Sequence, residues 1–396
     1  MTIRPTIKLR PKVNAQKLRF GFPWIYQDQL VLDRRSRAIP AGSLVTVVDG
    51  EGNTLGVWAY NADSKITCRK LKLDDSEDAD QAWLAKQLQM AAGHRDRLFD
   101  APYYRLIHAE ADGCPGLIVD RFGDVFVVQP NAAWVEARFE DLVSALIAVF
   151  SPRAIIKNAQ GRARKLEGLD EGLDVVHGYV SGIIDVPMNG AIYKADVLGG
   201  QKTGLFFDQR PNHALFQRVS KDAHVLDVFS HVGGFSLAAL AGGAKHALAV
   251  DGSEAALKLA TEGATAMGAA ERFQTRPGDA FDSMAALKAE GHVYEAVVCD
   301  PPAFAPQKPA LEAGLRAYER VARLGAGLVG PGGYLCLCSC SHAADLARFR
   351  EASLRGIGKA GRSGQIIATG GAGPDHPVHS YLAESAYLKS IFLRLD

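Results

Sequence analysis

The sequence predicts an α/β protein whose C-terminal part is a Rossmann-like domain with a mostly parallel, seven-stranded sheet, preceded by a β-rich barrel and a middle α+β domain. A length of 396 residues corresponds to two or three domains, and 47% hydrophobic with 22% charged residues is typical of a chain that builds cores. After Tyr193, strand-like runs alternate with helical patterns, which favours a parallel sheet covered by helices. We place the three domains at residues 1–73, 74–190 and 191–396.

The N-terminal and middle parts carry β-hairpin signals. Residues 42–60 hold two β-rich runs joined by a Gly-rich turn, and residues 18–26 interleave aromatic with basic side chains, which suits the core of a small barrel better than stacking on bases. An acidic tract then precedes a predicted helix at residues 81–98. In the middle part, a second hairpin turns at residues 121–124, and helical spacing extends over residues 134–150.

The C-terminal part supplies the alternating pattern. Its predicted helices begin at Gly233 and Ser253, and its predicted strands cover residues 225–229, 246–250, 296–300, 334–340 and 387–395. In such a doubly wound sheet, ligands bind at the carboxyl ends of the strands, where the strand order reverses. The residues that follow each predicted strand are therefore the candidates for a binding or catalytic site.

The distribution of charge and the composition favour a nucleic-acid-binding protein and argue against membrane and disulfide-rich secreted proteins. Residues 1–72 hold 13 Lys and Arg against 5 Asp and Glu, a net charge of +8, whereas the rest holds 32 against 39, a net charge of −7. A basic module on an acidic body suits an enzyme that binds a phosphate backbone, although a basic face that only aids solubility is the alternative. Apolar stretches such as residues 142–150 are too short to span a membrane, residues 1–10 lack a signal core, and six cysteines are too few for a disulfide framework. We expect a cytoplasmic protein with reduced thiols and no membrane partner.

Acidic residues mark the predicted nucleotide site. Asp227 ends the first strand of the alternation, and Gly233 opens the helix after it, but the three-glycine dinucleotide fingerprint is absent. Asp251 directly follows the second strand, where a carboxylate can accept both hydroxyls of a ribose, and Asp279 is placed to meet an adenine amine. Helix capping is the alternative role for both carboxylates. Together these features favour S-adenosylmethionine over NAD as the cofactor.

Two further strand ends carry the chemistry of the acceptor. Asp300 is followed by two prolines that fix the turn, which directs its carboxylate toward a planar substrate; a plain turn is the alternative. Cys336, Cys338 and Cys340 share one face of a strand. We expect no metal there, because a strand separates alternate positions by roughly 6 to 7 Å. Cys336 and Cys338 are therefore expected to be core residues, and Cys340 to face the site.

A thiol at that place suits pyrimidine chemistry. The C5 carbon of a pyrimidine is a poor nucleophile, and addition of a thiolate to C6 turns the ring into an enamine whose C5 accepts a methyl group. Asp300 would hold the ring through its N3/N4 edge. These atoms are inaccessible in a stacked duplex, so the base must be flipped out or unpaired.

Four segments, in order along the chain, resemble the bacterial 23S ribosomal RNA cytosine-C5 methyltransferase family. They are residues 201–210 (QKTGLFFDQR), 229–235 (FSHVGGF), 300–304 (DPPAF) and 339–341 (SCS). The resemblance implies an RNA-binding PUA domain, a middle domain that helps form the RNA cleft, a class I S-adenosylmethionine-dependent methyltransferase domain, and 5-methylcytosine in 23S rRNA as the product. It makes Cys340 the nucleophile and Asp300 its catalytic partner. The donor is expected to contact Phe206, Gln209, Asp227, Phe229, Gly233, Asp251, Asp279 and Asp300.

The chain departs from that family in two places. Ala303 stands where relatives often carry Lys, and residues 303–304 lack the second cysteine with which many such enzymes assist product release. Asp300 and His342 are the candidates for the group that removes the C5 proton.

Two other functions fit part of the sequence. The first is a guanine methyltransferase of the same architecture, in which Cys340 would be a packing residue without a catalytic role. The second is a non-catalytic RNA-binding or assembly factor, which would carry a vestigial donor site. We expect a monomer or homodimer whose partner is 23S rRNA, with an unpaired or flipped cytosine.

Overall fold

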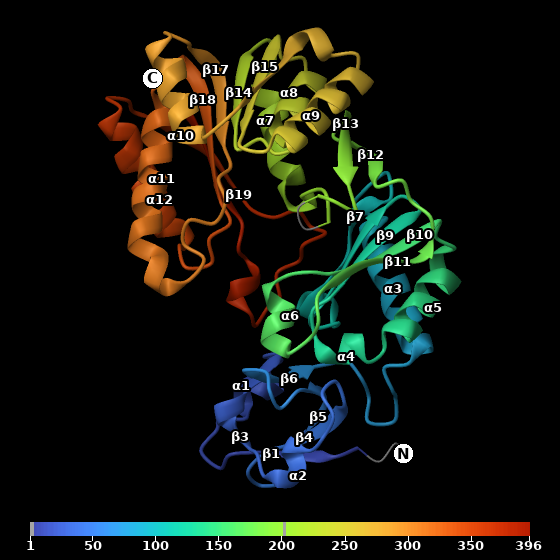
Figure 1. The fold of residues 1–396 in the computed structure, drawn as a ribbon. Coiled ribbons are helices and arrows are strands. Elements are labelled where there is room, and N and C mark those ends of the chain that lie inside the picture. Colours follow the sequence, from blue (N-terminus) through green and yellow to red (C-terminus); the bar gives the residue numbers. More distant parts are fainter. Residues whose placement is uncertain (1–3, 201–202) are drawn as a thin grey trace. The chain divides into compact units, whose positions relative to one another are not determined.

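The computed structural model describes residues 4–200 and 203–396 (Figure 1). Contacts divide the chain into two compact units. Unit 1 extends to Gly182 and includes Pro374–Ser385, and unit 2 comprises Ile183–Gly373 and Ala386–Asp396. The three predicted domains, with boundaries after residues 73 and 190, stay a prediction.

The first sheet of unit 1 has six strands. These are β1 (Thr6–Leu9), β2 (Trp24–Tyr26), β3 (Leu30–Val31), β4 (Leu44–Val48), β5 (Thr54–Tyr60) and β6 (Ile66–Lys70), in the order β2-β6-β5-β4-β1-β3, with the short helices α1 (Gln16–Arg19) and α2 (Arg34–Arg37). The predicted hairpin is confirmed, since β4 and β5 pair antiparallel. The Asp49 carboxylate fixes its turn by accepting hydrogen bonds from the backbone N–H groups of Glu51 and Asn53, both at 2.9 Å. Most aromatic side chains of this part lie in or against its core, as predicted, and Phe20 is exposed.

The second sheet of unit 1 has five strands, with helices packed on it. The strands are β7 (Tyr103–His108), β8 (Leu117–Phe122), β9 (Val125–Pro130), β10 (Ala154–Ala159) and β11 (Gly172–Gly178), in the order β11-β10-β9-β8-β7; the helices are α3 (Gln81–Arg95), α4 (Ala133–Glu136), α5 (Phe139–Phe150) and α6 (Arg162–Glu167). The prediction of one continuous helix over residues 134–150 was wrong, because the backbone of Arg138 leaves helical geometry and separates α4 from α5. The Arg138 side chain donates a hydrogen bond to the Gly42 carbonyl at 3.0 Å.

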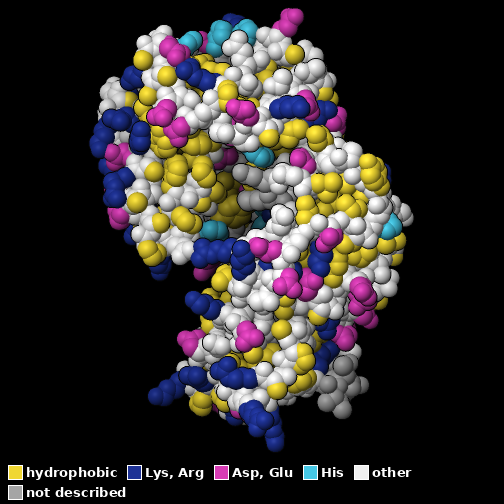
Figure 2. Space-filling model, viewed as in Figure 1, with side chains coloured by type: hydrophobic (Ala, Val, Ile, Leu, Met, Phe, Trp, Pro, Cys, Tyr) yellow, Lys and Arg dark blue, Asp and Glu magenta, His cyan; other side chains and the backbone are white. Residues whose placement is uncertain are grey.

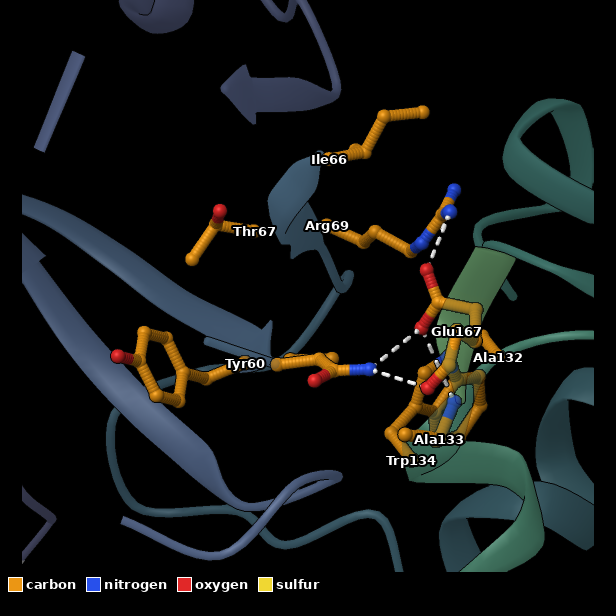
Figure 3. A pocket seen from close by; sticks show the side chains of 10 residues that line it. Tyr60, Ile66, Thr67, Arg69, Ala132, Ala133, Trp134 and Glu167 are labelled. Atoms are coloured by element: carbon orange, nitrogen blue, oxygen red, sulfur yellow. Dashed lines mark hydrogen bonds and ion pairs between the residues drawn. The ribbon is translucent and has the colours of Figure 1, made fainter. Parts of the chain in front are cut away.

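Glu167 joins the two sheets of unit 1. Its buried carboxylate accepts hydrogen bonds from Ser64 at 2.6 Å and Arg69 at 2.9 Å, and the Asn61 amide donates to it and to its backbone carbonyl. Figure 3 shows this carboxylate of α6 in direct contact with the Arg69 guanidinium of β6; both residues line a small cavity. Burial alone would raise the pKa of Glu167, but the Arg69 charge and these hydrogen bonds outweigh burial and lower it. This cavity is lined by structural contacts of unit 1 and contains none of the predicted site residues.

The segment Pro374–Ser385 of unit 1 packs on the second sheet. Arg95, which is fully buried, holds the Asp112 carboxylate with two bonds of 2.7 Å and donates to the Asp375 carbonyl at 3.1 Å. The Asp375 carboxylate accepts from the Arg105 backbone at 3.0 Å and lies 3.0 Å from a ring nitrogen of His376. These contacts bury His376 within unit 1.

Unit 2 is built on a seven-stranded sheet. Its strands are β14 (His224–Val228), β15 (His246–Asp251), β16 (Phe273–Pro277), β17 (Tyr294–Cys299), β18 (Val329–Ser339), β19 (Gly364–Gly370) and β20 (Lys389–Leu395), in the order β16-β15-β14-β17-β18-β20-β19. Its helices are α7 (Arg210–Val219), α8 (Gly234–Ala241), α9 (Glu254–Ala266), α10 (Ala280–Ala289), α11 (Leu311–Ala326) and α12 (Leu346–Lys359), and a hairpin is formed by β12 (Ile183–Met188) and β13 (Ala191–Asp196). β20 pairs antiparallel with both β18 and β19, and the remaining neighbours among the described strands of this sheet pair parallel. The predicted mostly parallel seven-stranded sheet is confirmed.

The strand order reverses between β14 and β17. From β14 the chain proceeds outward through β15 and β16, then crosses back to β17 on the other side of β14. Such a switch point opens a crevice at the carboxyl ends of the two strands. Within the described residues, none of the helices is both long and apolar enough to cross a membrane.

Candidate active site

The loop after β14 is held in an unusual backbone conformation. Phe229 and His231 have φ values of +65° and +50°, in the left-handed region that side chains other than glycine rarely adopt. The backbone N–H groups of Phe229 and Ser230 both donate to the Val250 carbonyl, at 2.9 and 3.0 Å. Gly233, at φ +80°, ends the loop as the residue before α8, where it needs the freedom of glycine. The sharp turn brings backbone rather than side chains to the switch point.

Asp227 lies beneath this loop and is fully buried. One carboxylate oxygen, Oδ2, accepts a hydrogen bond from the Ser236 backbone at 2.9 Å. The other, Oδ1, has no hydrogen-bond partner among the described residues. Burial raises the pKa of Asp227 to about 7, more than the hydrogen bonds from Ser236 lower it. A buried carboxyl that is only half satisfied is unfavourable unless a ligand completes its contacts.

Asp251 ends β15 and connects two loops. Its Oδ2 accepts from the His231 backbone and its Oδ1 from the Ser253 backbone, both at 2.8 Å. The cap of α9 is supplied by Ser253, which accepts from Ala256 at 3.2 Å, so Asp251 does not cap this helix. Each Asp251 oxygen keeps a second lone pair for a hydroxyl group.

Asp279, by contrast, is the capping residue of α10. Its Oδ1 accepts hydrogen bonds from the backbone of Phe281 at 2.9 Å and of Asp282 at 3.0 Å. Phe281 stands close to the rings of Phe229 and Phe304, with ring centres 6.3 and 6.2 Å away. Three phenylalanines thus form an apolar wall at the ends of β14 and β17. The predicted contact of Asp279 with adenine stays a prediction.

The Gln209 side chain contacts the carboxylate of Asp300. Its buried amide donates to Asp300 Oδ2 at 2.8 Å and accepts from the Asn212 amide at 2.6 Å. Asn212 in turn accepts from the Ser390 hydroxyl at 2.8 Å. This chain of contacts holds the Asp300 carboxylate from the side of α7 and β20. The ring of Phe206 lies edge-on to His231, with centroids 5.2 Å apart. The predicted donor contacts of Phe206 and Gln209 stay predictions; Gln201 and Lys202, in the same family-like segment, lie outside the described residues.

Cys340 follows the last residue of β18. All six cysteines of the chain lie among the described residues; the other five are buried, Cys340 is partly exposed, and none forms a disulfide. Its neighbours Ser339 and Ser341 both bond the Tyr318 hydroxyl, at 2.9 and 2.6 Å, and Ser341 also accepts from the Ala305 backbone at 2.9 Å. This network ties the Cys340 loop to the turn that follows Asp300. Sequence reasoning missed Tyr318, because its partners lie more than twenty residues away.

Cys336 and Cys338 are buried side by side, as predicted. Their sulfur atoms are 3.8 Å apart. We expected strand spacing to keep these two thiols too far apart to share a metal. This expectation was wrong, because the two side chains lean toward each other. Among the residues that the structure describes, no group of three or more His, Cys, Asp or Glu side chains is arranged to hold a metal ion.

Comparison with known proteins identifies the family. A family model described as an S-adenosylmethionine-dependent methyltransferase matches residues 156–355, and one described as a PUA-like domain matches residues 7–72. The ribosomal RNA large subunit methyltransferase I of Tolumonas auensis is 33% identical over 94% of this chain and 95% of its own length. The ribosomal RNA large subunit methyltransferase of Deinococcus radiodurans is also 33% identical, over 99% of this chain and 98% of its own length.

The chain belongs to the ribosomal RNA large subunit methyltransferase I family.

Solved structures agree on the fold of this large subunit methyltransferase. A crystal structure of SMU.776, described as a methyltransferase complexed with SAH, has a TM-score of 0.82 at 19% identity and covers 99% of this chain and 100% of that one. An S-adenosylmethionine-dependent methyltransferase from Streptococcus mutans gives 0.81 at 18%, over 98% and 100%. The PUA-like β domain and the class I methyltransferase fold are both confirmed. The methyltransferase uses S-adenosylmethionine as its donor and ribosomal RNA as its substrate.

The PUA-like domain of this methyltransferase carries the predicted basic charge at its surface. Figure 2 shows Lys and Arg side chains projecting from the module formed by β1–β6. Ten basic residues there are exposed: Lys8, Arg10, Lys12, Lys17, Arg19, Arg34, Arg35, Arg37, Lys65 and Lys72. Exposed charges of this kind bind phosphates through counterion release.

Proposed function

We propose that this methyltransferase modifies C5 of a cytosine in 23S rRNA through a covalent intermediate on Cys340. The observation that carries the proposal is the placement of Cys340. It is the one cysteine of six that is partly exposed, and it lies directly beyond the strand that pairs with β17, whose end carries Asp300. A structural cysteine would be expected inside the sheet, as Cys336 and Cys338 are.

The reaction balances with groups that the chain and the donor supply. The thiolate of Cys340 adds to C6 of the base, and the resulting enamine attacks the donor methyl group through C5, releasing the neutral thioether. Removal of the C5 proton and loss of the thiolate then restore the aromatic ring. Asp300, whose carboxylate is held by Gln209, would hold the N3/N4 edge during the addition. We propose Asp300 and His342 as candidates for the proton acceptor; His342 is exposed on the loop after Cys340.

Identification of the methylated nucleoside tests this proposal. The purified enzyme is incubated with labelled S-adenosylmethionine and large-subunit rRNA that lacks modifications, and the product is digested and analysed by mass spectrometry. We expect 5-methylcytosine. A methylguanine would support instead a guanine methyltransferase with the same fold, and RNA binding without methyl transfer would support an assembly factor.

The residues at the switch point fit S-adenosylmethionine. One buried carboxylate oxygen of Asp227 has no hydrogen-bond partner among the described residues, and the loop that follows β14 adopts left-handed backbone angles at Phe229 and Gly233. We infer that Asp227, Asp251 and the loop from Phe229 to Gly233 hold the donor. When bound, the donor would supply an electrophilic methyl group on a positively charged sulfur, and the negative charge of the Asp227 carboxylate would favour binding of that positive charge.

Donor affinity is therefore expected to depend on pH through Asp227. Its pKa of about 7 without ligand means that the carboxyl is largely neutral below pH 7 and charged above it. A cation binds the charged form, so affinity should fall as pH falls below 7, by up to about tenfold per pH unit. Titration calorimetry between pH 5.5 and 8.5 measures the affinity for the donor at each pH. Asp227→Asn, which keeps an oxygen acceptor for Ser236, should bind weakly and independently of pH; an unchanged pH dependence in this variant would exclude Asp227 as the group.

A further inference from the structure

Lys389 is a buried cation beside the Cys340 loop. It is the first residue of β20 and pairs in register with Ser339, the last residue of β18. Only 8% of its surface is exposed. Its ammonium donates to the Ser341 carbonyl at 2.6 Å and to the Ala344 carbonyl at 2.8 Å. Both acceptors belong to the loop that begins at Cys340, so Lys389 holds this loop against the sheet.

A buried ammonium is costly unless its charge is compensated. The two carbonyls supply partial charges and take two of its three donors, and a third remains. Burial lowers the pKa of Lys389, while interactions with the Cys340 and Asp345 anions would raise it. The interaction with Cys340 is mutual: a positive charge that a thiolate stabilises also stabilises that thiolate.

The other groups around Cys340 do not supply this charge. They are the Tyr318 phenol on α11, Asp345 at the start of α12, Asp300 after β17 and His342 on the same loop. Tyr318 is buried and its pKa is raised, so it is neutral. The two carboxyl groups cannot supply a positive charge. His342 is exposed and is charged only when protonated. Among these groups, Lys389 is the buried side chain that can carry a positive charge.

We propose that Lys389 is a positioning residue for methyl transfer, which fixes the Cys340 loop through two carbonyls and stabilises the thiolate form of Cys340. This inference rests on the proposed role of Cys340 as nucleophile and adds the source of its activation. A purely structural Lys389 would fix the loop without changing the reactivity of the thiol.

The test measures the thiol itself, independently of RNA. Alkylation of Cys340 by iodoacetamide is followed by mass spectrometry from pH 5.5 to 10, with Cys340→Ala as the blank. In the wild type we expect the pH midpoint to lie below that of free cysteine, about 8.5. Lys389→Arg keeps the charge and should keep a low midpoint. Lys389→Met and Lys389→Gln should raise the midpoint by about one unit and slow alkylation at pH 7 by about tenfold. Lys359→Met, on the exposed face of α12, is the matched control and should match the wild type.

Methyl transfer provides the second readout. The neutral variants should lose kcat at pH 7 and recover as pH rises, whereas donor affinity should stay unchanged. A wild-type midpoint at or above 8.5 would overturn the inference even if the neutral variants do not fold. Neutral variants that fold and alkylate like the wild type would also overturn it and leave Lys389 as a structural residue. Failure of the proposed function is distinct from both, because it appears as a product other than 5-methylcytosine or as RNA binding without methyl transfer by the wild type.

Discussion

Replacing Cys340 with Ala is expected to abolish methyl transfer to rRNA, lowering kcat by more than about 1,000-fold, because no other group in the site can form the bond to C6. The other five cysteines are buried and do not replace it. Donor binding should be unchanged, since the residues proposed to hold the donor lie at the carboxyl ends of β14 and β15 and in the loop after β14. Turnover with labelled S-adenosylmethionine and donor affinity by calorimetry are measured on the same preparation.

Trapping the covalent intermediate tests directly whether Cys340 forms a bond to the base. RNA that contains 5-fluorocytidine has no C5 proton to lose, so the wild-type enzyme should stop after methyl transfer with the RNA attached to Cys340. The adduct is seen as a shifted band on a denaturing gel and located by peptide mass spectrometry. Cys299→Ala, at a buried cysteine on β17, is the control and should still form the adduct. A Cys340→Ala enzyme that turns over normally would show that the thiol only packs, as in the guanine methyltransferase alternative.

The sequence was sufficient for those parts of the fold that have a local signal. The strands around Asp227 and Asp251 are short apolar runs followed by helices, and each lies within a residue or two of its predicted place. Because parallel strands end at one edge of a sheet, placing each Asp after a strand was enough to predict that they gather there. The position of Cys340 at the end of β18 followed from the same argument.

Other features lack any local signal. β19 was missed because its side chains are mostly exposed and it holds no apolar alternation. The packing of Pro374–Ser385 within unit 1 depends on Arg95, some 280 residues away along the chain. The bond between the Gln209 amide and Asp300, 91 residues later in the chain, was not predicted. Lys389 was predicted only as part of the last strand. Its ammonium contacts two carbonyl groups more than forty residues earlier in the chain, and the sequence carries no sign of these contacts. Long-range polar contacts of this kind leave no periodicity in a sequence.

Replacing Asp251 with Ala is expected to weaken donor binding by about 100-fold. Hydrogen bonds to a charged group contribute roughly 1.5 to 3 kcal/mol each, and the two ribose hydroxyls would lose such partners. The measurement is calorimetric titration with S-adenosylhomocysteine, because this ligand carries no methyl group to transfer and the enzyme therefore does not turn over. Asp279→Ala is the comparison variant: its carboxylate is exposed and already caps α10, so a smaller loss of affinity is expected.

Asp251 also holds the backbone of His231 and Ser253, so its loss can act through the loops as well as through the ribose. A donor analogue without the 2′ and 3′ hydroxyls separates these effects. If Asp251 binds the ribose, the wild type should bind this analogue about as weakly as Asp251→Ala does, and the substitution should cost the analogue little further affinity. If the substitution weakens both ligands by the same factor, Asp251 acts by shaping the loop from Phe229 to Gly233, and the ribose contact must be assigned elsewhere. The same comparison measures how much of the donor site depends on this loop, because any loss that remains with the analogue is the free energy of positioning alone.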